Sequence, residues 1–184
     1  MFYNFLMQIP IDEYFIHIAL PIITNPKYQS MKKYVAHGSY SVYDHSIRVA
    51  VLAYCMCRQN RWKVDYESLI TGCLLHDFYL YDWHHAHEGH KLHGFRHPFI
   101  ALMKARKVYK LNNKVCNMIR SHMFPLTFWT IPLSKEAWIL TLADKISATM
   151  EHKTIKSMKK LEKINDELEN SKKEENPLLE ETAL

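Results

Sequence analysis

Apolar residues recur every three or four positions along most of this chain, a spacing typical of amphipathic helices rather than strands. In the segment 44–58 the apolar stripe comprises His45, Val49, Leu52 and Met56. Because His45 occupies a position on that stripe, we expect its imidazole to face the interior of a helical bundle.

Prolines, glycines and capping residues divide the rest of the chain into further helices. One or two short helices are expected within residues 1–40, and residues 78–96 are predicted to form a loop. Four more helices are predicted to begin at Asp65, at His97, near Asn112 and near Ser134. The whole pattern predicts an all-α fold.

After Met150 the composition shifts to Lys, Glu and Asn, but apolar positions continue to recur. They are Ile155, Met158, Leu161, Ile164 and Leu168. We therefore divide the chain into a domain at 1–150 and a charged amphipathic helix with a disordered tail at 151–184. That helix could pack on the domain or bind a partner as a short coiled segment.

Composition and charge indicate one globular domain with an anionic ligand. The chain has 184 residues, of which 48% are hydrophobic and 23% charged. Its net charge of +5 combines +7 for residues 1–150 (17 basic, 10 acidic) with −2 for residues 151–184 (7 basic, 9 acidic). A mildly basic body suits a phosphate ester. The lysines are scattered and form no nucleic-acid-binding motif, so a nucleic-acid-binding helical module is kept only as an alternative.

Cysteine usage and the N-terminal segment bear on location. The four cysteines show no CxxC spacing, so we expect core residues in a reducing compartment. The apolar N-terminal stretch contains Asp12 and Glu13, which oppose insertion into a bilayer, and no small-residue cleavage site follows. We expect neither a signal peptide nor a membrane span, and a cytoplasmic location.

Several ionisable side chains lie within the apolar stretches of the predicted helices. Asp144 falls in AWILTLADKISATM, where its neighbours on the helix are small or apolar. His45 and the pair His76-Asp77 have similar surroundings. A buried ionised carboxylate is costly unless it is paired or bound to a metal. Residues of this kind on several helices of one small bundle therefore predict a shared centre.

A divalent cation would explain such a centre. Imidazole nitrogen and carboxylate oxygen together suit Fe, Mn, Zn, Co or Ni, whereas calcium prefers oxygen ligands alone. Taken singly, the residues have simpler explanations: His45 could be a hydrogen-bonded core histidine, and His76-Asp77 could be a helix terminus. Taken together, they favour a divalent transition-metal site.

The order His45, His76-Asp77, Asp144 resembles the H…HD…D signature of the HD-domain metal-dependent phosphohydrolase superfamily. The local strings HSIRVAVLA, GCLLHD and LADKISAT agree with it, and HGSYSVYDHSIRVA is similar to a small bacterial branch of stand-alone HD-domain proteins. The resemblance covers about residues 34–150. It implies a compact HD-domain helical bundle.

Two further histidines resemble ligands of the two-metal members. HPFIALMKA at His97 is similar to their HPxxG segment, and IRSHMF contains His122, while the HDIGK and GYP motifs of the cyclic-dinucleotide branch are absent. The resemblance implies two ions, with His93 as a rival to His97. One ion would be held by His45, His76, Asp77 and Asp144, and the other by His97 and His122, with Asp77 as the bridge.

The resemblance implies that a metal-activated hydroxide hydrolyses a phosphate ester or anhydride of a small metabolite, with a nucleotide as our first candidate. We expect Asp77, Arg48 and Lys145 to act in catalysis. We expect Arg48, Arg96, Lys145 and His93 to bind the substrate. The alternative is a non-catalytic nucleotide- or metal-binding HD sensor or regulatory protein. A second copy of the chain is a further candidate partner.

Overall fold

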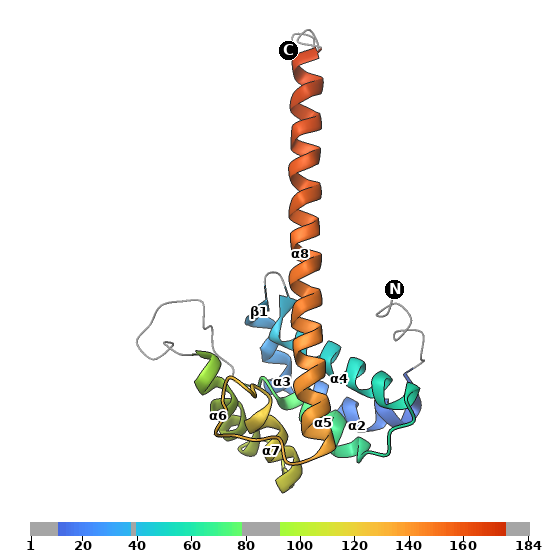
Figure 1. The fold of residues 1–184 in the computed structure, drawn as a ribbon, viewed down its shortest axis with the longest axis vertical. Helices are drawn as coiled ribbons and strands as arrows, with labels where there is room; N and C mark the ends of the chain where they lie inside the picture. The colour runs from blue at the N-terminus through green and yellow to red at the C-terminus, as the bar shows by residue number, and fades with distance from the viewer. Residues whose placement is uncertain (1–10, 38–39, 79–92, 176–184) are drawn as a thin grey trace.

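The structure is a computed structural model that describes residues 11–37, 40–78 and 93–175 (Figure 1). The helices are α2 (Glu13–Ile23), α3 (Pro26–Gln29), α4 (Val42–Gln59), α5 (Tyr66–Leu75), α6 (His93–Arg106), α7 (Asn113–Ser121) and α8 (Lys135–Glu175), with a 3-10 turn, η1 (Ser30–Lys33), after α3. Two very short strands, which the sequence analysis did not predict, pair antiparallel: β1 (Val35–His37) and β2 (Tyr40–Ser41). The all-α fold class is confirmed.

Capping side chains fix where several helices begin. In each case a side-chain oxygen accepts a hydrogen bond from a backbone N–H of the first turn, which leaves fewer unsatisfied donors at the helix end. The capping residues include Ser41, Asp65, Asn112 and Ser134. The predicted starts near positions 65, 112 and 134 are therefore confirmed.

The predicted start of α6 is wrong. The helix already begins at His93, so Pro98 lies inside it instead of in its first turn. Proline has no N–H to donate to the carbonyl four residues earlier, so one hydrogen bond of α6 is missing at this point. The helix nevertheless continues to Arg106, with His97 on its buried side.

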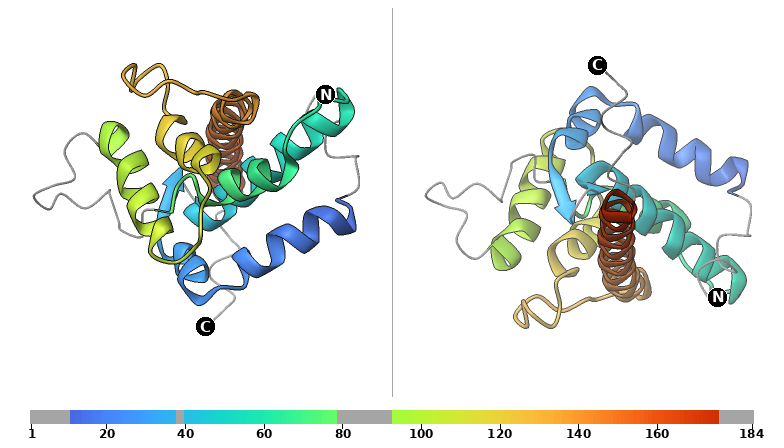
Figure 2. Two further views of the ribbon diagram at one scale, coloured as in Figure 1. Left: turned by 90° about the horizontal axis from the view of Figure 1, so that it is seen from below. Right: turned by 90° about the horizontal axis from the view of Figure 1, so that it is seen from above.

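Helix α4 lies at the centre of the bundle and is buried on almost every side. All nine residues from Val49 to Cys57 are buried. Helix α5 packs along α4, and α8 stands beside it, as the two views of Figure 2 show. The apolar stripe that we predicted covers only one side of this helix, whereas the buried residues cover all sides. A helix with buried residues all round is enclosed by its neighbours.

Close contact between α5 and α7 depends on Gly72. A Cβ atom at Gly72 would come within 2.5 Å of the Cε and 2.9 Å of the Sδ of Met118 on α7. Met118 is fully buried, so it has little room to move aside. Glycine thus allows α5 to approach α7 closely at a point one helical turn before His76, the residue that follows the end of α5.

Two expectations drawn from composition can be compared with the structure. All four cysteines, Cys55, Cys57, Cys73 and Cys116, are buried free thiols, which confirms them as core residues. Across the part of the chain that the structure describes, no helix combines the length and the apolar character needed to cross a membrane.

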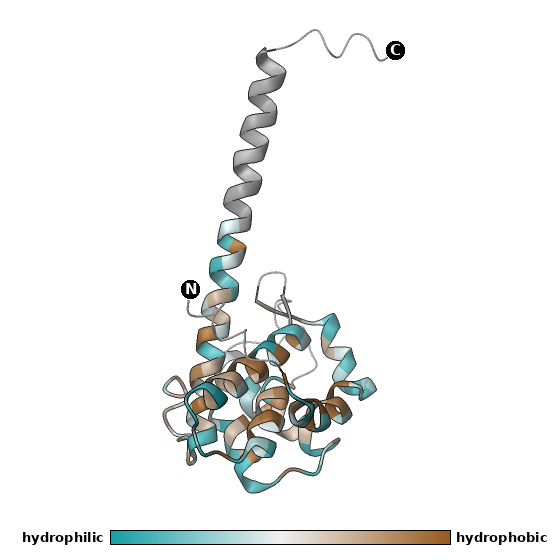
Figure 3. Cartoon of the chain, turned by 90° about the vertical axis from the view of Figure 1, so that its right-hand side faces the viewer, coloured by the Kyte–Doolittle hydropathy of each residue, from teal (hydrophilic) through white to brown (hydrophobic). Residues whose placement is uncertain are grey.

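Helix α8 is continuous from Lys135 to Glu175 and so runs across residue 150, where we divided the chain. Its first part packs against α4 and α7. Glu151 is still buried, whereas His152 is exposed. Beyond this point α8 extends away from the bundle (Figure 1), and Figure 3 shows apolar and polar positions alternating along the helices of the bundle at its base.

Candidate metal centre

Six buried ionisable side chains from five helices meet inside the bundle. They are His45 in the first turn of α4, His76 and Asp77 at the end of α5, His97 on α6, His122 at the end of α7, and Asp144 on α8. None of these residues is more than 8% exposed. The fold thus brings together all six residues that we nominated as metal ligands.

One group of donor atoms surrounds Asp144. The Oδ1 atom of Asp144 lies 3.1 Å from His45 Nε2 and 3.7 Å from His76 Nε2. The Oδ2 atom of Asp77 lies 3.5 Å from His76 Nε2 and 4.0 Å from His45 Nε2. One atom each from His45, His76 and Asp144 lies within 4.8 Å of the others, which is close enough for all three to bind one ion.

A second group lies on the other side of the Asp77 carboxylate. The Nε2 atoms of His97 and His122 are 2.8 Å apart. The Oδ1 atom of Asp77 is 3.3 Å from the first and 3.5 Å from the second. The two oxygens of Asp77 therefore face different histidine pairs, which is the position of a ligand that can bridge two ions.

Backbone carbonyls orient two of the histidines. His76 Nδ1 donates to the carbonyl of Cys73 at 2.7 Å, and His122 Nδ1 donates to the carbonyl of Ile119 at 2.8 Å. A carbonyl can only accept, so each Nδ1 carries a proton, and in the neutral imidazole the lone pair is then on Nε2, toward the centre. Metal-binding histidines are commonly held in this way.

A third histidine, His45, is oriented by Glu151, which the sequence analysis missed. Its fully buried carboxylate accepts from His45 Nδ1 at 3.0 and 3.1 Å and from the Ser147 hydroxyl at 3.1 Å. Glu151 lies seven residues after Asp144, so two helical turns separate them on one face. That spacing could have revealed it, but we had assigned residues from 151 onward to a separate segment.

Two atoms of the cluster lack hydrogen-bond partners among the described residues. They are His76 Nε2 and Asp77 Oδ1, both fully enclosed. Buried polar atoms are rarely left unsatisfied. Both are electron-pair donors, and they belong to different sides of the cluster. A divalent cation on each side would satisfy them, so the residues present fit a metal centre.

The charges within the cluster suit metal binding. Burial would raise the pKa of Asp77 and of Asp144, but the neighbouring histidines outweigh it and hold both pKa values well below their usual range. Burial and repulsion from other histidines lower the pKa of His122 to about 3. Against burial, hydrogen bonds to Asp144 and Glu151 raise the pKa of His45 to about 10. The carboxylates are ionised and His122 is neutral, as ligation requires, whereas His45 is protonated without an ion and would release its Nε2 proton when a metal binds.

Three cationic residues that we expected at the substrate lie around this centre. Arg48 is half-buried one turn after His45, with its guanidinium 4.3 Å from the centroid of the tyrosine ring on β2. Lys145 is exposed, and its Nζ donates to the backbone carbonyl of His122 at 3.2 Å. Arg96 is exposed on α6. Their roles stay predictions.

Of His93 and His97, the two candidates for the same metal ligand, the structure describes the side chain of His97 only. His97 lies in the centre, 3.3 Å from Asp77. His93 is the first residue of α6, and its side chain lies outside the described part of the chain. Most of the predicted loop, residues 79–92, lies outside it as well.

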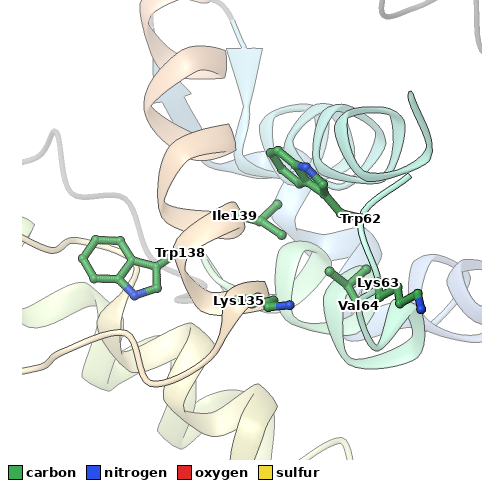
Figure 4. Close-up of a pocket in the computed structure, with 6 residues that line it drawn as sticks. All are labelled: Trp62, Lys63, Val64, Lys135, Trp138 and Ile139. Carbon is green, nitrogen blue, oxygen red and sulfur yellow. The ribbon is translucent and has the colours of Figure 1, made fainter. Parts of the chain in front are cut away.

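A surface cavity of about 370 Å³ lies elsewhere in the molecule (Figure 4). It is lined by Trp62, Lys63 and Val64 after α4 and by Lys135, Trp138 and Ile139 at the start of α8. None of the six cluster residues lines it, so this cavity is not the place where the candidate ligands act.

The described helices bury four histidines and two aspartates, and one of these carboxylates faces two histidine pairs, which defines a helical protein with a candidate metal centre. The family model described as HD domain matches residues 42–149, well over half of the chain and all six cluster residues. The chain belongs to the HD-domain family, part of a superfamily of metal-dependent phosphohydrolases. No curated protein and no solved structure matches the chain.

Proposed function

We propose that this protein is a two-metal phosphohydrolase that cleaves a phosphate ester or anhydride of a small metabolite, with a nucleotide as the first candidate. The observation that carries the proposal is the placement of Asp77. Its two carboxylate oxygens face two separate histidine pairs at 3.3–4.0 Å. A single-ion site would not need a buried carboxylate between two sets of imidazoles.

The six residues of the cluster would form two groups of metal ligands. The first ion would be held by His45, His76, Asp77 and Asp144. The second would be held by His97 and His122, with Asp77 shared. When bound, the two ions supply Lewis acidity that activates water and neutralises charge on the phosphate. The protein holds these donors close to one point, with Asp77 and Asp144 ionised and His122 neutral, which lowers the reorganisation needed during the reaction.

Residues at the edge of the centre fit a phosphorylated substrate. Lys145 and Arg48 are the nearest cations to the cluster along α8 and α4, and both can offset phosphate charge. The exposed rings of Phe95 and Trp129 stack with centroids 6.0 Å apart. Phe95 lies two residues before His97 on α6. Residues two apart on a helix lie on different faces, so this exposed pair lies away from His97, and the choice of a nucleotide rests on the sequence alone.

The proposal is tested by phosphate release. Metal-free protein is reloaded with Mn²⁺, Fe²⁺ or Co²⁺ and offered a panel of nucleotides and phosphomonoesters. We expect turnover that depends on the metal. Asp77→Asn should reduce it by more than about 100-fold, because the amide cannot bridge two cations and loss of a ligand exceeds the effect of an outer residue. Glu67→Gln makes a similar change at an exposed position on α5 and should leave turnover unchanged.

Two outcomes would contradict the proposal, the first against hydrolysis and the second against the two-metal centre at Asp77. The first is no turnover of any substrate in the panel by protein that holds two ions per chain. The second is turnover that survives Asp77→Asn. Tight nucleotide binding at full metal occupancy without product would favour the non-catalytic sensor instead.

A further inference from the structure

The face of α8 that is buried in the bundle continues past the end of the bundle. Buried residues recur along it at Leu140, Asp144, Ser147 and Glu151, and the next position on the same face is Ile155. Other described helices cover this face as far as Glu151. Further on, Figure 1 shows α8 running alone, beyond the other described elements. At 1.5 Å per residue, the part from 152 to 175 is about 36 Å long.

The sequence keeps an apolar seam along this extension. Apolar residues recur on the extension every three or four residues, at Ile155, Met158, Leu161, Ile164 and Leu168. A seam of this width is typical of a helix that packs against one other helix. A single exposed helix gains little stability from intrinsic propensity, so such a seam calls for a partner.

The charges along the extension indicate which partner. Residues 153–163 contain five lysines and one glutamate, whereas residues 164–175 contain five carboxylates and two lysines. A helix with a basic half and an acidic half is complementary to a copy of itself that runs in the opposite direction. A parallel copy would place like charges together.

We propose that two copies of this chain associate through the extension of α8 as an antiparallel helix pair. The pair is centred at Leu161. In that register the apolar seams face each other: Met158 lies opposite Ile164, and Ile155 lies one residue away from the position opposite Leu168. The same register aligns Lys153 with Glu169, Lys156 with Asp166 and Lys160 with Glu162. The agreement of apolar and charged positions in one register is what argues for a second copy of this chain. The inference does not depend on the proposed function.

The oligomeric state tests the proposal. In sedimentation equilibrium of the full chain we expect a reversible dimer of the 21.9 kDa chain. The double variant Lys153→Glu with Lys156→Glu should weaken the dimer by at least about tenfold, because both changes place carboxylates opposite an acidic segment. Adding Asp166→Lys and Glu169→Lys to the same chain should restore it.

A control variant and a check of folding accompany these measurements. Lys107→Glu with Lys110→Glu changes the net charge equally at exposed positions away from α8 and should leave the dimer intact. Far-UV circular dichroism confirms that each variant keeps its helices. A monomer at 100 μM would overturn the proposal, as would equal weakening by the control variant. A dimer unchanged or strengthened by Lys153→Glu with Lys156→Glu would overturn the antiparallel arrangement.

A cross-link reports orientation independently of charge. Positions 157 and 165 are equally far from Leu161, so Ser157→Cys in one copy should form a disulfide with Asn165→Cys in another. The native cysteines are buried and do not compete. Cross-linking of Ser157→Cys with itself, and not with Asn165→Cys, would show a parallel pair and contradict the proposal.

Discussion

Replacing Glu151 by alanine removes the carboxylate that holds His45 in place. In the protein, both oxygens of this carboxylate accept hydrogen bonds from His45 Nδ1, and one of them also accepts from the Ser147 hydroxyl. The Glu151 side chain has no exposed surface. Without it, His45 keeps a buried N–H with no acceptor at that position, and its ring is free to turn about its side-chain bonds.

The expected losses of stability and of metal affinity in Glu151→Ala follow from the burial of this carboxylate. Removing one partner of a buried charged pair costs about 3–5 kcal/mol of folding stability, and loss of an outer contact to a metal-binding histidine weakens metal binding by about 10–100-fold. Glu151→Gln keeps an oxygen that can accept from His45 Nδ1 and removes only the charge. Because hydrogen bonds to charged groups exceed neutral ones by about 1 kcal/mol, we expect Glu151→Gln to lose about that amount.

Two assays separate these effects. Urea denaturation of the metal-free protein gives the loss of stability, and competition with a chromophoric chelator gives the loss of metal affinity. The exposed Glu67→Gln serves as the control in both. If Glu151→Ala matches the control in stability and binds metal within twofold of the unaltered protein, then Glu151 does not hold His45 and the reasoning fails.

Three more predictions concern packing, acid stability and metal content. Gly72→Ala should lower the free energy of unfolding by about 1–3 kcal/mol in urea, because the new methyl group overlaps a buried methionine of α7; an unchanged midpoint would contradict the packing. Asp65 has a pKa below its ordinary 3.8 because, against burial, hydrogen bonds from Ser68 and the Lys114 ammonium favour its ionised form. Its contribution is complete well above the ordinary value of 3.8 and is lost as pH falls through the lowered pKa, so Asp65→Asn should flatten the acid side of the stability profile; identical profiles would contradict this. His97→Ala should reduce the metal content measured by mass spectrometry from two ions per chain to one, and a retained second ion would exclude His97 as a ligand.

The sequence was informative where the cost of burial decides a residue's role. His45 and Asp144 could be placed in the interior because their neighbours along the helix are apolar, and an unpaired ionisable group in such a place needs a partner. The resemblance then added His97 and His122. The helix starts at Asp65 and Ser134 were predictable because capping is a local interaction between residues three apart.

Features that depend on contacts between distant segments could not be predicted in the same way. The complete burial of α4 results from neighbours on all sides, which a single-helix pattern does not encode. The start of α6 at His93 was missed because proline is most common in a first turn, whereas Pro98 lies further along. Glu151 was missed because a change in composition was taken as the end of the domain, although the helix does not break there.

The six cluster residues come from helices that are far apart in the chain, from His45 to Asp144. An ion shared among them would join α4 to α8 and α5 to α7 much as a covalent cross-link does, and it would do so only in the folded chain. Chelators should then act as mild denaturants of this protein, because removing the ions also removes the links between the helices that carry their ligands.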